Sequence, residues 1–480
     1  VNLTIEGGKV LCLLGENGSG KTTLMNVLSG IYMPEQGHIL KNGVEIQIRS
    51  PKDAFANGIG MIHQHFKLVD VLTVTENIIL GLKEKGKLNI RAAAQKIAAI
   101  CEKYGFDLDP MAKIYDLSVS QKQTVEIVKV LFRGAEILIL DEPTAVLTPQ
   151  ETDRLFQVVR NMRADGKAIV LITHKLHEVL SVSDEVAVLR KGKYIGTVKT
   201  SEATAQSLTD MMVGRAVSLN IDRPDPVDPK PRLKIEGLTC VDNLGVKRLD
   251  DVTFTAMSGE ILGIAGIAGS GQRELLECIT GLYPVEHGTV TFLPEGKPAQ
   301  QLIGKTPNQI RKAGVAMAFV PEDRLGMGLV GSMGMGSNMM LRSWRKGKGA
   351  FVNRRDPNKL AMEVMEELEV VTPSISTPVR RLSGGNVQKV LVGREIAMSP
   401  SVLLTAYAVR GLDINTSYTI YNLLTQQKMK GSAVVFVGED LDVLLELCDR
   451  ILVLCGGKIS GIVDARTATK EEIGLLMTKV

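Results

Sequence analysis

The sequence has 480 residues, 44% of them hydrophobic and 23% charged, which is the composition of a globular protein with sizeable buried cores. A net charge of +4, without a basic run interleaved with aromatic residues, gives no argument for nucleic-acid binding. No apolar run approaches the length of a membrane-spanning helix. The six cysteines have no paired metal-ligand spacing, and we expect them to be buried thiols of a protein from a reducing cytosol.

Apolar runs alternate with helix-length segments in the first half of the chain. The runs 10–14, 137–140 and 168–173 predict buried parallel strands. The segments 91–104 and 121–132 predict helices. Alternating strands and helices imply a three-layer α/β core.

One further helix has explicit start and stop signals. Thr148–Glu151 is a capping box with Pro149 at the first helical position. Gly166 is expected to end this helix.

A glycine-rich loop follows the first predicted strand. Residues 15–22 read Gly-Glu-Asn-Gly-Ser-Gly-Lys-Thr, the pattern of a P-loop, in which backbone N–H groups surround nucleotide phosphates at a helix N-terminus. Lys21 would reach the β- and γ-phosphates, and the Thr22 hydroxyl would bind Mg²⁺. The predicted nucleotide contacts are Gly15, Glu16, Asn17, Gly18, Ser19, Gly20, Lys21, Thr22 and Thr23.

The predicted catalytic side chains follow strand ends. Asp141 and Glu142 end the strand 137–140, so they would emerge beside the P-loop at the carboxyl edge of the sheet. Asp141 is the predicted Mg²⁺ ligand, directly or through water, and Glu142 would polarise the attacking water. Gln64 is predicted to reach Mg²⁺ and the γ-phosphate, and His174 the γ-phosphate. Taken alone, these residues also fit a solvated acidic pair, a loop glutamine and a structural histidine.

The P-loop recurs in degenerate form 251 residues later. Gly266–Arg273 keeps the glycines but has Gln272 in place of the lysine and Arg273 in place of the hydroxyl. The strand before the loop recurs as well, since Val252–Thr255 matches Val1–Thr4. We therefore predict two homologous domains, one with a working nucleotide site and one with a disabled site. Because Val1 falls inside an expected strand, we expect that the chain lacks its natural N-terminus.

A segment rich in proline and aspartate separates the two repeats. Residues 218–231 include four prolines, which cannot donate to a backbone ladder, so we expect an extended linker. The first domain is placed at 1–217 and the second at 232–480.

The second half contains Leu-Ser-Gly-Gly-Asn at 382–386, which resembles the signature sequence of ATP-binding cassette (ABC) proteins. Alone, this run also fits a Ser/Gly turn before a helix, but with the two P-loops the resemblance covers essentially the whole chain. It implies an α/β fold of two tandem ABC-type P-loop NTPase domains, each with a nucleotide core, an antiparallel β region and an α-helical subdomain. It also implies head-to-tail packing, with each ATP between the P-loop of one cassette and the signature of the other.

The same resemblance assigns further nucleotide contacts to the second half. Ser383, Gly384 and Gly385 would start a helix and complete the cage around the γ-phosphate. Asp413 would be the loop aspartate that crosses the interface between the cassettes.

The two halves, aligned at an offset of 265 residues, differ where catalysis needs specific groups. The matched pairs are Asp141 and Ala406, Glu142 and Tyr407, and His174 and Glu439. The second cassette is therefore expected not to hydrolyse ATP. The first half has Val119 and Ser120 in place of the signature glycines, so every defect belongs to one of the two composite sites.

Several stretches resemble the fused ATP-binding subunits of simple-sugar and nucleoside importers. These stretches are Met61–Phe66, Leu68–Asp70, Asp141–Glu151, Pro321–Arg324 and 382–386. The His-Gln-His-Phe form looks more like the nucleoside branch, which works with a lipoprotein binding protein. The resemblance implies ATP and Mg²⁺ as cofactors and a position at the cytoplasmic face of the cell membrane. The implied partners are two transmembrane permease subunits, one of which would contact residues 66–77, and through them an extracytoplasmic substrate-binding lipoprotein.

The sequence departs from this family at a few positions. Ser120 stands where glycine is usual, Val387 where glutamine is usual, and residues 406–409 where Ala-Gln-Pro-Thr is typical. The adenine-stacking aromatic of the family lies upstream of the strand that begins at Val1, so we expect the chain to lack that contact.

Two classes of function remain for a tandem cassette protein. One is the ATPase motor of an importer, and the other is a soluble tandem cassette that acts on ribosomes or DNA. The second class usually has two working sites and a basic interdomain segment, and its DNA-repair type has zinc-binding cysteine pairs; the sequence has none of these. We therefore favour the importer, whose substrate specificity would lie in the permease and the binding protein.

Overall fold

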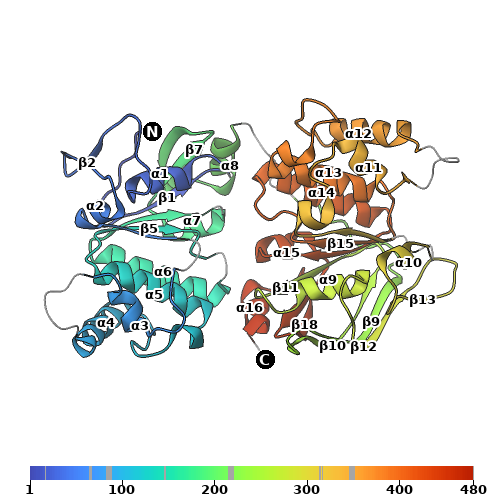
Figure 1. Ribbon diagram of the computed structural model, residues 1–480, viewed down its shortest axis with the longest axis horizontal. Helices are drawn as coiled ribbons and strands as arrows, with labels where there is room; N and C mark the ends of the chain where they lie inside the picture. Colours follow the sequence, from blue (N-terminus) through green and yellow to red (C-terminus); the bar gives the residue numbers. More distant parts are fainter. Residues whose placement is uncertain are drawn as a thin grey trace. The chain divides into compact units, whose positions relative to one another are not determined.

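The computed structural model describes residues 1–16, 18–63, 67–82, 89–144, 147–173, 175–214, 221–312, 315, 317–344 and 352–478. The chain divides into two compact units, Val1–Ser218 (unit 1) and Leu219–Val480 (unit 2). Each unit is built around a six-stranded sheet (Figure 1).

The sheet of unit 1 has the strand order β4-β5-β6-β1-β7-β8. Its strands are β4 (Ile59–Ile62), β5 (Ile137–Asp141), β6 (Ala168–Ile172), β1 (Val10–Leu14), β7 (Glu185–Arg190) and β8 (Lys193–Lys199). All neighbouring pairs are parallel except β7 and β8. A separate antiparallel pair consists of β2 (Ile39–Lys41) and β3 (Val44–Ile46). The strands β1 and β6 are buried at every residue, which explains their continuous apolar sequences.

Helices cover both faces of this sheet. They are α1 (Lys21–Leu28), α2 (Pro51–Ala56), α3 (Val74–Ile79), α4 (Ile90–Tyr104), α5 (Val119–Phe132), α6 (Pro149–Ala164), α7 (Leu176–Val182) and α8 (Ala205–Val213), with 3₁₀ turns at Ile114–Asp116 and Thr200–Glu202. Figure 1 shows α1 on one side of the sheet and α5 and α6 on the other. The helices α3, α4 and α5 share a separate core that includes Val74, Ile97 and Val128.

Unit 2 repeats the strand order of unit 1 as β14-β15-β16-β11-β17-β18. These strands are β14 (Met317–Val320), β15 (Val402–Ala406), β16 (Ala433–Val437), β11 (Ile261–Gly266), β17 (Arg450–Cys455) and β18 (Lys458–Asp464). A four-stranded antiparallel sheet contains β10 (Lys247–Met257), β9 (Pro231–Val241), β12 (His287–Phe292) and β13 (Gln300–Gln301). The helices are α9 (Gln272–Thr280), α10 (Pro307–Lys312), α11 (Met335–Met340), α12 (Arg355–Glu367), α13 (Gly384–Ile396), α14 (Ile414–Met429), α15 (Leu441–Leu447) and α16 (Lys470–Thr478). Single turns lie at Arg324–Gly328 and Val379–Arg381.

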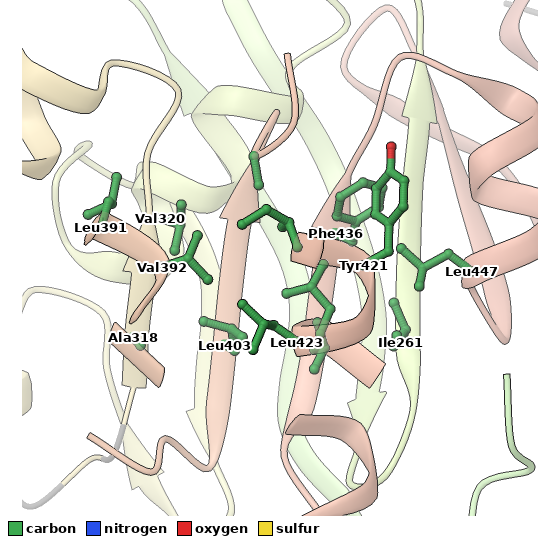
Figure 2. Close-up of a cluster of buried hydrophobic side chains, with 14 of the residues drawn as sticks. Ile261, Ala318, Val320, Leu391, Val392, Leu403, Tyr421, Leu423, Phe436 and Leu447 are labelled. Atoms are coloured by element: carbon green, nitrogen blue, oxygen red, sulfur yellow. The ribbon is translucent and has the colours of Figure 1, made fainter. Parts of the chain in front are cut away.

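The repeat extends to the interior of the units. From α6 and α14 onward, every helix and strand of unit 2 starts 265 residues after its counterpart in unit 1. Figure 2 shows part of the unit 2 core, in which side chains of α13 and α14 pack on the sheet strands. Tyr421 of α14 meets Phe436 of β16 edge to face, with ring centroids 6.2 Å apart. The predicted α/β class with two homologous domains is confirmed.

One expected strand does not form. Residues 1–6 have no regular secondary structure, whereas the matching Val252–Thr255 lies in β10 and pairs with β9. A strand needs a neighbour to accept and donate its backbone hydrogen bonds. Within the described part of unit 1, no strand lies beside residues 1–6.

The described part of the expected linker is attached to unit 2. Ile221 is buried in the core of that unit. Arg223 donates to the carbonyl oxygens of Leu445 and Cys448, at 2.7 Å each. Lys428, which is itself buried, donates to Pro224 O. Residues 221–230 thus form no helix or strand and are held against unit 2, whereas Pro231, the last residue of the expected linker, is the first residue of β9. All six cysteines are buried free thiols.

Candidate active site

The P-loop of unit 1 lies between β1 and α1. Gly18 and Gly20 have φ angles of 78° and 97°, in the left-handed region that favours glycine. Lys21 opens α1 and is 7% exposed. Its Nζ donates to the carbonyl oxygens of Gly15 at 2.6 Å and Glu16 at 3.0 Å. Neutral backbone oxygens therefore hold the ammonium at the loop.

The polar groups of this loop fit an anionic ligand. The Ser19 hydroxyl is buried without a hydrogen-bond partner, an arrangement that is rare unless a ligand or water completes it. Burial lowers the pKa of Lys21, against the charges of Glu142 and Asp141. The side chains of Thr22 and Thr23 are exposed at the start of α1. Phosphate oxygens would satisfy these groups, as predicted from the loop sequence; Asn17 lies outside the described residues.

The two acidic residues lie at the carboxyl end of β5. Asp141 is buried, and this burial together with the charge of Glu142 raises the pKa of Asp141 to about 6, while Lys21 opposes the rise. Glu142 has φ 47°, and its backbone N–H donates to Ile172 O of β6 at 2.9 Å. The left-handed conformation costs of order 1 kcal/mol for such a residue. A bound cation would relieve the cost of ionising the buried carboxyl of Asp141.

The other predicted residues of this site cannot be placed. Gln64 and His174 lie outside the described residues. His63, which precedes Gln64, follows β4, and Thr173, which precedes His174, follows β6. Both strands lie on the same side of β1 in the sheet order.

The intact signature of unit 2 lies at the start of α13. Ser383 is the N-cap, and its Oγ accepts a hydrogen bond from Asn386 Nδ2 at 2.9 Å. Gly384 is exposed. A Cβ on Gly385 would lie 3.2 Å from both Asp413 Oδ2 and Thr416 Oγ1, which is tighter than most side-chain contacts. Any larger residue at position 385 would therefore require the side chain of Asp413 or Thr416 to shift.

The loop aspartate is also a helix cap. Asp413 caps α14, with its Oδ1 accepting from Thr416 N at 2.8 Å. Its counterpart Thr148 caps α6 in a capping box with Glu151, as the sequence predicted. In unit 1, Val119 occupies the position of the first signature glycine and is 46% exposed.

The P-loop of unit 2 has the backbone conformation of the P-loop of unit 1 but lacks its lysine. Gly269 and Gly271 have φ angles of 86° and 100°, close to the values in unit 1. Gln272 is 2% exposed and donates to Ile267 O at 3.0 Å, the counterpart of the bond from Lys21 to Glu16 O. Arg273 is paired with Glu277 at 2.7 Å.

An internal ion-pair network lies at the degenerate site of unit 2. Arg410 pairs with Glu322 at 2.5 Å and with Glu439 at 3.1 Å, and its guanidinium lies 5.8 Å from the ring centroid of Tyr407. Burial and the charges of Glu439 and Glu322 raise the pKa of Tyr407 to about 12. A cavity of about 390 Å³ beside Ala406 is lined partly by Glu322. The positions of unit 2 that match the predicted contacts Gln64 and His174 are thus occupied by carboxylates that pair with Arg410.

Sequence reasoning missed this network and one cluster in unit 1. Glu178 of α7 is 1% exposed and accepts hydrogen bonds from Thr144 and Thr173. The sequence did contain a signal for Glu322. This residue lies two positions after the end of β14, as Gln64 lies two positions after the end of β4. Glu178, a single glutamate in a helix that the sequence analysis did not predict, gives no comparable signal.

Both units match one known protein family. The sequence model of the ABC transporter family matches residues 1–145 and 249–405. The chain is 42% identical to the nucleoside import ATP-binding protein NupA of Lactococcus lactis subsp. cremoris over 99% of this chain and 94% of that protein. It is also 42% identical to the guanosine import ATP-binding protein NupO of Bacillus subtilis, over 99% and 93%. The glucose import ATP-binding protein TsgD13 of Haloferax volcanii is 37% identical over 100% and 92%.

A solved structure shares the fold at lower identity. The archaeal ribosome recycling factor aABCE1, in complex with the ribosomal stalk protein aP1, matches with a TM-score of 0.61 and 17% identity over 94% of this chain and 84% of that chain. Among the described residues, we find no helix of the length and apolarity that a membrane span requires. With a family match in both units and full-length relatives, the chain belongs to the ABC transporter family of ATPases and carries two ATP-binding cassettes in tandem.

Proposed function

We propose that this chain is the motor subunit of an importer for nucleosides or simple sugars, and that it hydrolyses ATP at one composite site. The observation that carries the proposal is the asymmetry between the units. Unit 1 has the buried Lys21 near Asp141 and Glu142, whereas unit 2 has Gln272, Ala406 and Tyr407 at the matching positions. The relatives named for nucleoside, guanosine and glucose import support the transport role.

In this proposal each residue of unit 1 has a defined role. Lys21 and the P-loop N–H groups bind the β- and γ-phosphates, with Thr22, Asp141 and Gln64 as ligands of Mg²⁺. The bound ion neutralises phosphate charge during transfer. Glu142 orients and polarises the attacking water, and His174 contacts the γ-phosphate. The raised pKa of Asp141 supports a cation site, because a nearby cation favours the ionised carboxylate.

Unit 2 supplies the second half of the same site. Ser383, Gly384, Gly385 and Asp413 would face the γ-phosphate of the ATP that Lys21 holds. The exposure of Ser383 and Gly384 at the N-terminus of α13 supports this role, because the N–H groups of a helix start favour phosphate. Head-to-tail pairing of the cassettes within the chain is part of the proposal, as are the bounds 1–217, 218–231 and 232–480.

The proposed partners are two transmembrane permease subunits. Import ATP-binding subunits are associated with the membrane through permeases, and we place this chain at the cytoplasmic face. The segment 66–77 would contact one permease. Val69 and Val71 in this segment are 40% and 68% exposed, which suits a protein contact. An extracytoplasmic substrate-binding lipoprotein would deliver the substrate.

The alternative function, a soluble tandem cassette acting on ribosomes or DNA, has weaker support. The likeness to the ribosome recycling factor concerns the fold alone. The sequence relatives with high coverage carry import names.

Co-reconstitution tests the proposal. The chain is assembled with candidate permeases in liposomes, and ATP hydrolysis is measured with nucleosides or sugars and their binding protein present. We expect one substrate class to stimulate hydrolysis severalfold. Stimulation by ribosomes or DNA, with no response to any permease, would favour the alternative.

A further inference from the structure

A buried carboxylate joins two strand ends in unit 1. Glu178 Oε2 accepts hydrogen bonds from Thr144 Oγ1 at 2.7 Å and Thr173 Oγ1 at 3.0 Å. Its Oε1 lies 3.1 Å from Lys175 Nζ, which also donates to Thr144 O at 3.2 Å. Glu178, Thr144 and Thr173 are each at most 2% exposed. We call these four residues the Glu178 cluster.

The cluster lies next to the proposed catalytic positions. Thr144 follows Glu142 by two residues, in the loop after β5. Thr173 and Lys175 flank position 174 at the end of β6. The cluster therefore ties the loop that carries Glu142 to the segment that carries His174.

Unit 2 has the same backbone without the cluster. At the matching positions it has Val409, Gly438, Asp440 and Val443. Nevertheless, β15, β16 and α15 have the lengths of β5, β6 and α7. The turn after the strand is also the same, because Tyr407 has φ 50° and donates its N–H to Val437 O at 3.1 Å, as Glu142 does to Ile172 O at 2.9 Å.

The fold therefore does not require the cluster. Burying a carboxylate and an ammonium carries a desolvation penalty, and replacing buried ionic groups with packed apolar residues is often neutral or stabilising. Unit 2 has such apolar residues in Val409 and Val443. The unit that keeps the ionic cluster is the one that keeps Asp141 and Glu142, which indicates a role in the reaction.

We propose that Glu178 is a positioning residue for ATP hydrolysis, which holds the loop of Glu142 and the segment Thr173–Lys175 in a fixed relation. This inference rests on the proposed catalytic role of Glu142. Hydrolysis depends on placing the attacking water in line with the γ-phosphate, and a displacement of about 1 Å can cost about a hundredfold in rate. Binding of the β-phosphate by the P-loop does not use the cluster.

The test compares three variants of the full chain assembled with its permease. Glu178→Gln keeps the side-chain size, and the double variant Thr144→Val with Glu178→Val copies the residues of unit 2. We expect kcat to fall about tenfold to a hundredfold in both, while the affinity for ADP and the free energy of unfolding stay near their original values. The control Glu185→Gln removes a Glu–Lys pair of 2.7 Å at the opposite end of the strands, and its kcat should stay within about twofold.

A combination with Glu142→Gln separates positioning from general stability. If Glu178 acts through Glu142, adding Glu178→Gln to Glu142→Gln should lower the residual rate by less than twofold. The inference fails if either Glu178 variant keeps its kcat, or if the affinity for ADP falls together with kcat. It also fails if the rate losses of Glu178→Gln and Glu142→Gln multiply in the double variant. A normal rate in Glu142→Gln alone would instead overturn the proposed catalytic assignment.

Discussion

Lys21 and Gln272 occupy the same place in two P-loops of nearly identical backbone. Both donate to the loop carbonyl five residues earlier, but only Lys21 has a charge left for phosphate. The next position also differs in what it offers a ligand. Thr22 is exposed, whereas Arg273 is paired with Glu277. At the residue scale, the two units differ by charge and hydrogen-bonding capacity rather than by shape.

The first prediction concerns Lys21 and Glu142, which are proposed to bind and to cleave ATP. Lys21→Ala removes the phosphate clamp and should abolish both tight nucleotide binding and hydrolysis. Glu142→Gln keeps the clamp, so it should retain ATP while its turnover falls at least about a hundredfold. Bound nucleotide and phosphate release, measured on the same preparations, distinguish the two variants. A Glu142→Gln variant with a normal rate would show that another group polarises the water.

A second prediction follows from the raised pKa of Asp141. Because burial raises this pKa from 3.8 to about 6, the native state binds more protons than the unfolded state between these pH values. The contribution of Asp141 to stability is therefore present below about pH 4 and is lost as the pH rises through about 6. Asp141→Asn should raise the free energy of unfolding by about 3 kcal/mol at pH 7.5 without Mg²⁺.

Urea unfolding at two pH values checks this prediction. At pH 4 the variant and the original chain should have similar stability, because Asp141 is then protonated in the native state. The same variant should lose Mg²⁺-dependent ATP hydrolysis. Equal stabilisation at both pH values would mean that the charge of Asp141 is not its cause.

At the element scale, the two signature helices differ at their first turn. Both α5 and α13 begin at a serine N-cap. In α13, Gly384 and Gly385 leave the helix start open, and Gly385 packs against Asp413. In α5, Val119 and Ser120 place side chains there instead. Each helix therefore has a serine cap, but the side chains at the helix N-terminus leave less room for a ligand in α5 than in α13.

The third prediction compares one substitution at both helix starts. Gly385→Asp would crowd Asp413 and Thr416 and add charge at the helix start where the γ-phosphate of the Lys21-bound ATP is proposed to lie, so it should nearly abolish the ATPase activity. In the proposed head-to-tail pairing, Ser120→Asp would face the degenerate site and should leave much of the activity. Steady-state ATPase assays on the reconstituted complex, with nucleotide binding measured in parallel, make the comparison. A larger loss from Ser120→Asp would mean that unit 1 uses its own signature.

At the scale of the whole molecule, the chain contains one fold twice and, in our proposal, one reaction site. Unit 2 keeps the sheet order of unit 1 although Glu322, Tyr407 and Glu439 stand where unit 1 has the predicted catalytic residues Gln64, Glu142 and His174. The pairing of Arg410 with Glu322 and Glu439 places two carboxylates and one cation at this site, which suits anionic phosphates less well than the lysine of unit 1. Degeneration has therefore changed the chemistry of unit 2 and preserved its architecture.

The fourth prediction is a stoichiometry of one. Each chain should trap one ATP in the Glu142→Gln variant, as measured by nucleotide quantification. Gln272→Lys restores the positive charge of the P-loop. It does not restore the carboxylates of Asp141 and Glu142, which Ala406 and Tyr407 replace in unit 2, so the rate of hydrolysis should not double. Two hydrolysing sites in the unmodified chain would overturn the asymmetric assignment.

Local patterns were sufficient for much of the fold. The strand 10–14 and the helix ending at Tyr104 have the predicted positions, and the capping box at Thr148 forms as predicted. These features depend on contacts within a few residues, which a sequence displays directly. The expected strand at 1–4 was wrong because a strand also depends on a partner elsewhere in the chain.

The sequence by itself determined the repeat, the two P-loops, the signature and the residues missing from unit 2, because each depends on residue types at fixed spacing. Only the tertiary structure decided which charges meet. Glu178 contacts Thr144 over 34 residues, and Arg410 contacts Glu322 over 88. It also decided the burial that raises the pKa of Asp141 and lowers that of Lys21. Burial and ion pairing arise from packing between distant segments, and that packing determines the chemistry of a site whose residues the sequence can only name.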